Sequence, residues 1–359
     1  MNFFKNFLNF LNKKQKNFFF VLVLFSILQT ILEMIGIAAA IPFVTFLLNP
    51  ESLSEFGFIT NLINLDQIIM TDQLIIIFCV AFFSIFLIKN LIIVITNKLT
   101  YNFIFSFRTN LFKNLINKIL HQDYIFFVKK GISQIFNTTL NEVNMYSLNI
   151  VKSLIILFSE ILISFGILLL IILTGNIKGL ILIFPIIIIV SIILKKINQS
   201  IKSWSVTRIE QNEKIINYNL NLINGIKEIL IFGKANELVN KFENSLKSLK
   251  DVDIKHNVVT AYPKVLLEQA VILIFILIIL ILNYLGTPND NIIIILSFYL
   301  VAAYRLVPSI NKIFVSYQSI KYGKPSIPKV MEYYNLSINN NYLKNEKNLE
   351  SLKFEKNIE

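Results

Sequence analysis

The side chains best able to do chemistry in this sequence are charges that stand inside long apolar segments. Arg305 and Lys89 each lie well within such a segment, and Glu33 and Glu160 lie within two others. A charge at the centre of a membrane-spanning helix costs at least about 2.5–3.5 kcal/mol, so it usually serves a function. Embedded cations of this kind could face a substrate inside the membrane.

Ion pairing is the first alternative to ligand binding. Arg305 lies too deep in its segment to reach the interface easily, whereas Lys89 could extend its aliphatic chain to water. Three embedded carboxylates could pair with Arg305, those of Glu33, Glu160 and Glu268. The same acids could form a proton relay, but each stands alone on its segment without His or Asp between them, which makes a poor relay.

The composition requires an integral membrane protein. Of 359 residues, 55% are hydrophobic and only 16% are charged, and the mean hydropathy is +0.65, whereas soluble domains carry about 25% charged residues. The single cysteine, Cys79, excludes a disulfide framework, and the two histidines, His121 and His256, exclude a histidine-rich metal centre. The formal charge of +12 is divided among apolar runs, which argues against a nucleic-acid-binding domain.

Six apolar segments must position the embedded charges. Each is long enough, or nearly so, to cross a bilayer, which needs about 20 residues. Arg305 and Lys312 share the last segment, and the other embedded charges each lie on a different one. The segments are Phe18–Leu48, Leu74–Asn97, Ser153–Thr174, Gly179–Ile197, Val265–Asn283 and Ile292–Ile313.

The distribution of basic residues sets the topology. Residues 49–71 hold three acids and no Lys or Arg, whereas 31 of the 34 basic residues fall at the N-terminus, in 98–152, in 195–264 or from Lys312 onward. The positive-inside rule therefore predicts six crossings with both termini in the cytoplasm. No cleavable signal is expected, because the first apolar run is too long for one.

The first cytoplasmic stretch carries a helical pattern instead of a loop pattern. No Gly or Pro interrupts residues 58–130. One helix is predicted from Thr71 to Leu120, about 75 Å long at 1.5 Å per residue, which is more than twice the bilayer core. Its apolar stripe at i+4 spacing is Leu99, Phe103, Phe107, Leu111, Leu115 and Ile119.

A second helical arm is predicted from Lys195 to Gly225, and again after Gly233 toward Pro263. Two hairpins would therefore project into the cytoplasm, each ending in a non-helical tip that carries aromatic residues, at 121–131 and 224–233. The alternative for such arms is a coiled-coil seam between two copies. Two interrupted tips fit a docking surface for a soluble partner better.

These arms and tips resemble the transmembrane half of an ABC exporter of the six-helix, long-arm type. Residues 123–127 with Gly131 are similar to the family's first coupling segment, and residues 224–229 with Phe232-Gly233 are similar to the second. The resemblance covers nearly the whole chain and implies an all-α membrane fold of six helices with long cytoplasmic extensions, in a domain-swapped dimer. The residues it implies for coupling to the ATPase domain are Asp123, Tyr124, Phe127, Gly225, Glu228 and Ile229.

No ATP-binding motif of that family is found in the sequence. None of the ten glycines begins a G-x-x-x-x-G-K-[ST] phosphate loop. Residues 352–359 look like the first strand of the family's nucleotide-binding domain, so we expect 1–335 to be the transmembrane domain and 336–359 a linker and the start of that missing domain. This chain itself should hold no cofactor. ATP and Mg²⁺ would be bound, and ATP hydrolysed, only with a nucleotide-binding domain, removed by truncation or on a separate chain.

Residues 304–312 resemble the sixth-helix stretch of the PglK group of lipid-linked oligosaccharide flippases. Residues 49–71 are long enough for the external amphipathic helix by which that subgroup holds a polyprenyl tail. Its cationic belt, which binds pyrophosphate, would correspond here to Lys89, Lys264, Arg305 and Lys312. Lys264 and Lys312 stand where Arg is usual, which weakens bidentate phosphate recognition. Both also lie near segment ends, where the positive-inside rule explains a basic residue as well as ligand binding does.

The sequence therefore predicts the transmembrane half of an ATP-driven exporter or flippase. The expected substrate is an amphiphile with an anionic head, a polyprenyl-pyrophosphate-linked oligosaccharide of protein glycosylation, moved across the bacterial inner membrane. The expected partners are a nucleotide-binding domain and a second identical half, and no nucleic acid. The alternatives are export of another lipid or of a peptide, a non-transporting scaffold whose arms bind a soluble partner, and a truncated product without function.

Overall fold

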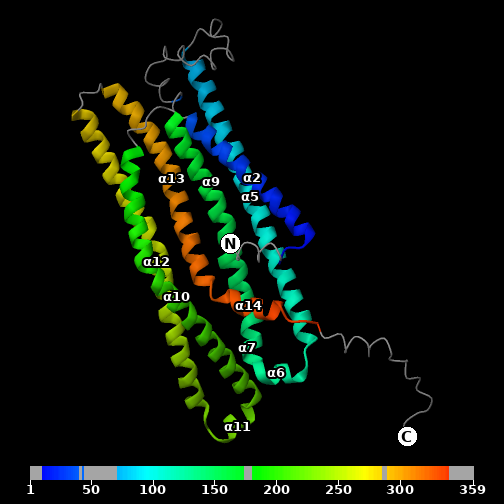
Figure 1. Ribbon diagram of the computed structural model, residues 1–359. Coiled ribbons are helices and arrows are strands. Elements are labelled where there is room, and N and C mark those ends of the chain that lie inside the picture. The colour runs from blue at the N-terminus through cyan, green and yellow to red at the C-terminus, as the bar shows by residue number, and fades with distance from the viewer. Residues whose placement is uncertain (1–9, 40–42, 44–70, 174–179, 285–288, 339–359) are drawn as a thin grey trace, which may run out of the picture.

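Long helices that extend well beyond a membrane's thickness make up this chain (Figure 1). The computed structural model describes residues 10–39, 43, 71–173, 180–284 and 289–338, and within these ranges the chain is helical and contains no strand. In chain order the helices, with η for π-helical turns, are α2 Lys13–Ala38, α5 Thr71–Leu120, α6 Tyr124–Lys130, α7 Ile132–Phe136, η3 Asn137–Glu142, α8 Val143–Met145, η4 Tyr146–Val151, α9 Lys152–Leu173, α10 Leu180–Asn224, α11 Ile226–Ile231, α12 Ala235–Tyr284, α13 Asn289–Gly323 and α14 Ser326–Tyr334.

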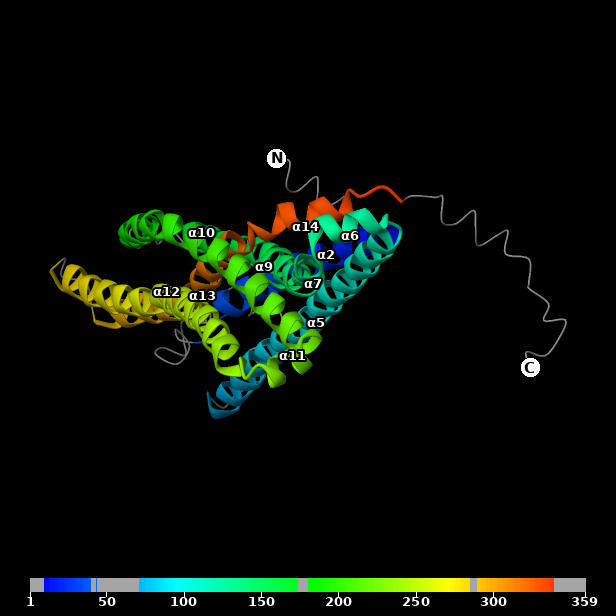
Figure 2. The ribbon, with the colours of Figure 1, turned by 90° about the horizontal axis from the view of Figure 1, so that it is seen from below.

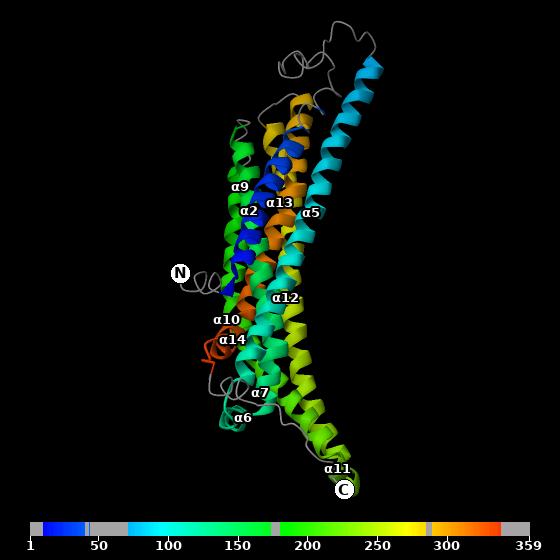
Figure 3. The same ribbon diagram turned by 90° about the vertical axis from the view of Figure 1, so that its right-hand side faces the viewer.

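Helix α5 confirms the predicted long arm. It is a single helix of 50 residues with the predicted bounds, and it follows one edge of the molecule (Figure 3). The predicted apolar stripe is its buried face, since all stripe residues from Phe103 to Ile119 are at most 4% exposed and Leu99 packs against them. Packing against other helices therefore holds the half of α5 that ends at Leu120.

The core at the base of the arms, named the cytoplasmic core after the predicted topology, gathers side chains from both ends of the described chain. Tyr146 of η4 lies against the rings of Phe107 and Phe10 and is 1% exposed. Helix α14 adds Val330 and Tyr333, which are 0% and 1% exposed, and it crosses one face of the bundle against η3 and α5 (Figures 1 and 2). This core fixes the base from which the arms extend.

Helices α10 and α12 form the second arm and lie side by side along its length (Figure 2). α10 ends at Asn224 and α12 begins at Ala235, so the arm turns at 224–233 as predicted. The other large helix contacts join α9 to α13, α2 to α5 and α9, and α12 to α13. Helix α13 thus connects the α10–α12 arm to the bundle of α2, α5 and α9.

The prediction that both tips are non-helical is wrong. Tip residues 124–130 form α6, preceded by Asp123 in an extended conformation and ended by Gly131 at φ 74°. Residues 226–231 form α11, and Gly233 at φ 63° makes the turn into α12. Neither short segment contains Gly or Pro inside it, so each folds into one or two helical turns, α6 between Asp123 and Gly131 and α11 between Gly225 and Gly233.

Four of the described helical stretches are long and apolar enough to cross a membrane. They are Lys13–Ala38, Cys79–Leu120, Ile132–Leu173 and Ala235–Ile281, and they overlap the first, second, third and fifth predicted segments. Helices α10 and α13 cover the fourth and sixth segments, but the side chains of 180–199 and of most of 289–298 lie outside the described residues. So do the predicted external helix in 49–71 and the strand-like tail at 352–359.

Candidate functional site

Glu33 on α2 is the centre of a buried ion-pair network. Its side chain is 2% exposed, and its Oε2 lies 3.5 Å from Nζ of Lys89 on α5. Its Oε1 lies 2.9 Å from Nη2 of Arg305 on α13. One carboxylate therefore joins three helices.

Glu160 on α9 extends this network toward the arms. Its Oε1 lies 2.6 Å from Nζ of Lys312, and its Oε2 lies 3.9 Å from Nη2 of Arg305. Arg305 and Lys312 are two helical turns apart, so they share one face of α13. The five charges of the network, three cations and two carboxylates, leave a formal charge of +1.

Small residues let α2 approach its neighbours closely enough to build this network. A Cβ on Gly166 of α9 would lie 2.9 Å from side-chain atoms of Met34 and Thr30, which is too close for any other residue without a shift. A Cβ on Gly36 would lie 3.7 Å from Lys89 Cδ. The close crossings place Glu33 between α5, α9 and α13 instead of against lipid.

Both deeply embedded cations are ion-paired. The pairing alternative for Arg305 is observed with Glu33 and, at longer range, with Glu160. Lys89 turns inward, with a side chain 12% exposed and Nζ 4.3 Å from the centre of the Phe86 ring. A role for these cations toward a ligand stays a prediction.

Lys264 is not brought together with the other three predicted cations. It lies on α12, and its Nζ is 3.9 Å from Glu268 Oε1 within the same helix. The two side chains are 65% and 53% exposed in the single chain. Glu268 is therefore also separate from Glu33 and Glu160, so the three carboxylates are not assembled into a relay.

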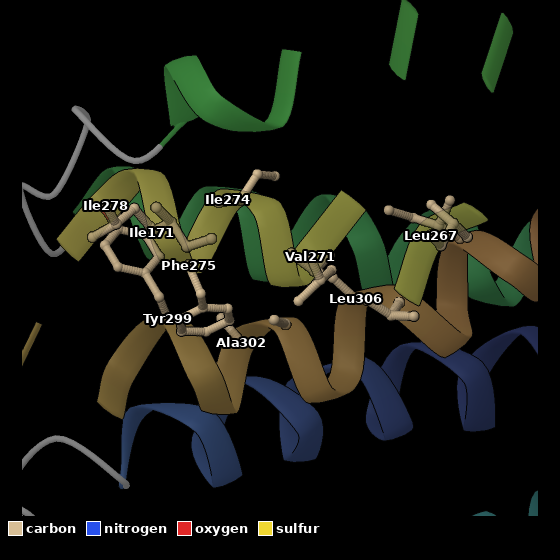
Figure 4. Close-up of a pocket in the computed structure, with 12 residues that line it drawn as sticks. Ile171, Leu267, Val271, Ile274, Phe275, Ile278, Tyr299, Ala302 and Leu306 are labelled. Carbon is tan, nitrogen blue, oxygen red and sulfur yellow. The ribbon is translucent and has the colours of Figure 1, made fainter. Parts of the chain in front are cut away.

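An apolar cavity of about 60 Å³ lies beside the network, between α12 and α13, with Ile171 of α9 at its edge (Figure 4). Tyr299, Ala302 and Leu306 line it from α13, and Leu267, Val271 and Phe275 from α12. Ala302 and Leu306 flank Arg305 in sequence, so one stretch of α13 presents charge toward α2 and α9 and apolar surface toward α12. The cavity is too small for a lipid tail in this conformation.

The first tip presents apolar side chains at the end of the arm. Tyr124 is 79% exposed, Ile125 62% and Val128 65%. Phe127 is half-buried and packs against the cytoplasmic core, and Asp123 precedes the first turn of α6. Of the predicted coupling residues here, Tyr124 is thus available for contact, whereas Phe127 anchors the tip.

The second tip is more exposed still. Leu230, Ile231 and Phe232 are 71%, 68% and 72% exposed. Gly225 precedes α11, Glu228 is exposed within it, and Ile229 is partly buried. The three most exposed apolar residues were not among the predicted coupling residues, although they lie in the same segment.

A second buried ion pair, in the cytoplasmic core, was not anticipated. Arg208 of α10 donates to both carboxylate oxygens of Glu142 in η3, at 3.2 and 3.0 Å. Ser326, at the start of α14, donates to Glu142 and accepts from Arg208 at 3.2 Å. This cluster ties the second arm to the bundle. The sequence feature that could have indicated this buried pair is the position of Arg208, two turns from the buried Ile201 on an apolar face of α10.

Aromatic and titratable groups surround that pair. The imidazole of His256 on α12 stacks on the ring of Tyr322 at 3.8 Å, and the Tyr322 hydroxyl donates to Asp253 at 3.3 Å. The Arg208 guanidinium lies 5.5 Å from the same ring. Burial lowers the pKa of His256, and the Arg208 charge acts in the same direction, whereas Asp253 opposes it.

Apolar spans, two arms that continue beyond them, short helices at the arm tips and a charged network inside the bundle define the membrane region of a transporter. Residues 56–304 match the family model described as the ABC transporter transmembrane region. This is more than half of the chain, and the chain belongs to that family. The match includes Lys89, Lys264 and both tips, and it ends before Arg305 and Lys312. The protein is therefore a multi-pass membrane protein and a transporter membrane half, of a kind that pairs with a nucleotide-binding domain and a second half.

Proposed function

We propose that this chain is the membrane half of an ATP-driven flippase for an amphiphile with an anionic head, a polyprenyl-pyrophosphate-linked oligosaccharide in the bacterial inner membrane. In this proposal six helices cross with both termini in the cytoplasm, and a second identical half completes a domain-swapped dimer. The observation that carries it is the network in which two buried carboxylates meet three cations, the largely buried Lys89 and Arg305 and the half-exposed Lys312.

The network suits an anion because its carboxylates are exchangeable partners. A pyrophosphate can accept from Arg305 in place of Glu33, and from Lys312 in place of Glu160. Charge-assisted hydrogen bonds to phosphate gain strength where water is excluded. The displaced carboxylates would then no longer hold α2 and α9 against α13. Binding of the head would thereby weaken the contacts that close the bundle.

Energy for the crossing must come from outside this chain, because a charged head does not cross about 30 Å of hydrocarbon unaided. In our proposal the exposed tips, α6 and α11, bind the nucleotide-binding domains, whose ATP and Mg²⁺ drive closure. The exposed apolar residues of both tips support this role, since they lie far from the apolar spans that lipid would cover.

The test is reconstitution of the chain with its nucleotide-binding partner in proteoliposomes. Lipid-linked oligosaccharide should stimulate ATP hydrolysis, and Arg305→Ala should abolish the stimulation while basal hydrolysis persists. Lys247→Ala is the matched control, because Lys247 pairs with Glu243 on the exposed surface of the cytoplasmic arm. Equal stimulation of the wild type and Arg305→Ala would overturn the proposal and leave another lipid, a peptide or a scaffold as the alternatives.

A further inference from the structure

Polar side chains line the facing surfaces of α9 and α13. Arg305, Ser309, Lys312 and Ser316 recur on α13 at i, i+4, i+7 and i+11, and so share one face. On α9, Ser153, Glu160 and Ser164 share one face at i, i+7 and i+11. The contacts of Glu160 with Arg305 and Lys312 show that the two faces meet.

The helices run in opposite directions, so the position of each serine follows from these ion pairs (Figure 1). Ser309 lies one turn from Arg305 on the side of Lys312, opposite Glu160. Ser164 lies one turn from Glu160 on the side of Arg305. Ser309 is 0% exposed and Glu160 4%. The seam is thus closed, with Arg305 and two hydroxyls on its outer half.

Both hydroxyls lack a hydrogen-bond partner. Ser164 Oγ and Ser309 Oγ are buried and make no hydrogen bond, and the same holds for Arg305 Nε and for one acceptor, Glu160 Oε2. Serines inside helices ordinarily bond to their own backbone, as Ser26 does to the carbonyl of Leu22 at 2.9 Å. Buried polar atoms without partners are rare, and in the membrane they call for a bound group or water.

The chemistry of the seam favours an anion as that group. Ser164, Ser309 and Arg305 Nε each offer an unused donor, and the surrounding network has a formal charge of +1. An oxyanion accepts at several oxygens at once and would use these donors together. A neutral or cationic group would leave the excess positive charge unpaired.

We propose that Ser164 and Ser309 form, with Arg305 Nε, a subsite for phosphate-type oxygens between α9 and α13. This inference rests on the proposed function and adds two neutral residues to the cationic belt. When the carboxylate of Glu160 moves from Arg305, the hydroxyls donate to the oxygens of the incoming head. They would distinguish a phosphate head from a mere negative charge, because hydroxyl donors require an oxygen at a fixed place.

The experiment measures binding to the full chain in nanodiscs of phosphatidylcholine. The probes are farnesyl diphosphate, inorganic diphosphate and farnesol, so that lipid-linked and free phosphate are separated from the tail alone. The Ser164→Ala/Ser309→Ala double variant should bind both diphosphates about tenfold more weakly, equivalent to about 1.4 kcal/mol. Farnesol binding should be unchanged. Ser26→Ala is the matched control, since its buried hydroxyl is already bonded to its own helix.

The outcomes separate the subsite from the function it rests on. Wild-type diphosphate binding by the double serine variant, with weakened binding by Arg305→Ala, would overturn the subsite and indicate that the hydroxyls hold water only. Wild-type binding by Arg305→Ala as well would overturn the proposed function itself. An equal loss of farnesol and diphosphate binding would also overturn the subsite, because the serines would then act on the fold.

Discussion

Arg305 of α13 and Glu33 of α2 lie 2.9 Å apart, with the carboxylate 2% exposed, so helices from opposite ends of the described chain are joined by one ion pair inside the bundle. Lys89 of α5 shares the same carboxylate at 3.5 Å. Breaking a buried pair by removing one partner typically costs about 3–5 kcal/mol, because the other charge is left uncompensated. The pair therefore stabilises the closed bundle and, in the proposed function, competes with the substrate.

Glu33→Gln tests this competition directly. The variant keeps the size of the side chain but leaves Arg305 and Lys89 without their shared carboxylate. Affinity for farnesyl diphosphate in nanodiscs should rise about tenfold, which corresponds to about 1.4 kcal/mol, while the midpoint of thermal unfolding falls. Glu243→Gln, which removes an exposed carboxylate from a surface pair on the arm, should change neither quantity. Equal or weaker diphosphate binding by Glu33→Gln would show that this carboxylate does not compete with an anion.

The cytoplasmic pair Arg208–Glu142 provides a second prediction, on stability alone. Its side chains are 4% and 0% exposed and bonded at both carboxylate oxygens, so Glu142→Gln should lower the free energy of unfolding by about 3–5 kcal/mol. The Glu142→Leu/Arg208→Met double variant should lose much less, because no buried charge is left unpaired. Denaturant unfolding in detergent measures both. If the double variant lost as much free energy of unfolding as the sum of the two single variants, the result would contradict a direct coupling between the two side chains.

The apolar periodicity of the sequence predicted the arms correctly because it reflects one physical requirement, the burial of an apolar helix face. The stripe from Leu99 to Ile119 is covered by protein, and its i+4 spacing allows this only on a helix. The tips were predicted as breaks but not as helices. The breaks at 121–123, Gly131, Gly225 and Gly233 mark where helices end, whereas the six or seven residues between two such breaks carry too little periodicity to predict a further turn.

The sequence predicted which residues belong to the candidate site, but it did not predict which of them form ion pairs with each other. The cost of charge in an apolar segment singled out Arg305, Lys89 and Glu33. Which carboxylate meets which cation depends on the rotation of each helix, and close crossings such as that at Gly166 set this rotation. Arg208 and Glu142 were missed because they lie 66 positions apart on cytoplasmic helices, where charges are common and carry no such cost.

His256 provides a prediction on pH. Burial lowers its pKa below the ordinary 6.5, Arg208 adds to this effect and Asp253 opposes it, and the stacked Tyr322 ring carries no charge at acidic pH. The unfolded chain therefore binds a proton near pH 6.5, and the folded chain only at lower pH. Stability should be constant above that range, fall as the pH decreases below 6.5, and level off below the folded pKa.

Thermal unfolding in detergent between pH 8 and pH 5 measures this loss. His256→Gln should flatten the decrease, because the substituted side chain does not titrate, and its stability at pH 8 need not match the wild type. The control is His121→Gln, which removes the other histidine, directly after α5 at the first tip, where its ring bonds to the carbonyl of Asn117 at 2.6 Å. An unchanged pH profile in His256→Gln would show that acid acts on other groups.

The tips provide the last prediction, on coupling. Tyr124 is 79% exposed and Phe232 72%, so neither contributes much to the fold, and single alanine substitutions should change the free energy of unfolding by no more than about 0.5 kcal/mol. If the tips bind the nucleotide-binding domains, each variant should nonetheless reduce substrate-stimulated ATP hydrolysis several-fold, because an exposed aromatic anchor at an interface commonly contributes about 2 kcal/mol or more.

Lys227→Ala is the matched control, since it removes an exposed, polar side chain from α11. Stimulation that persists in the Tyr124→Ala/Phe232→Ala double variant would mean that these helices are not the contact, whatever the substrate. Loss of stimulation together with loss of thermal stability would assign both aromatic side chains to the fold instead.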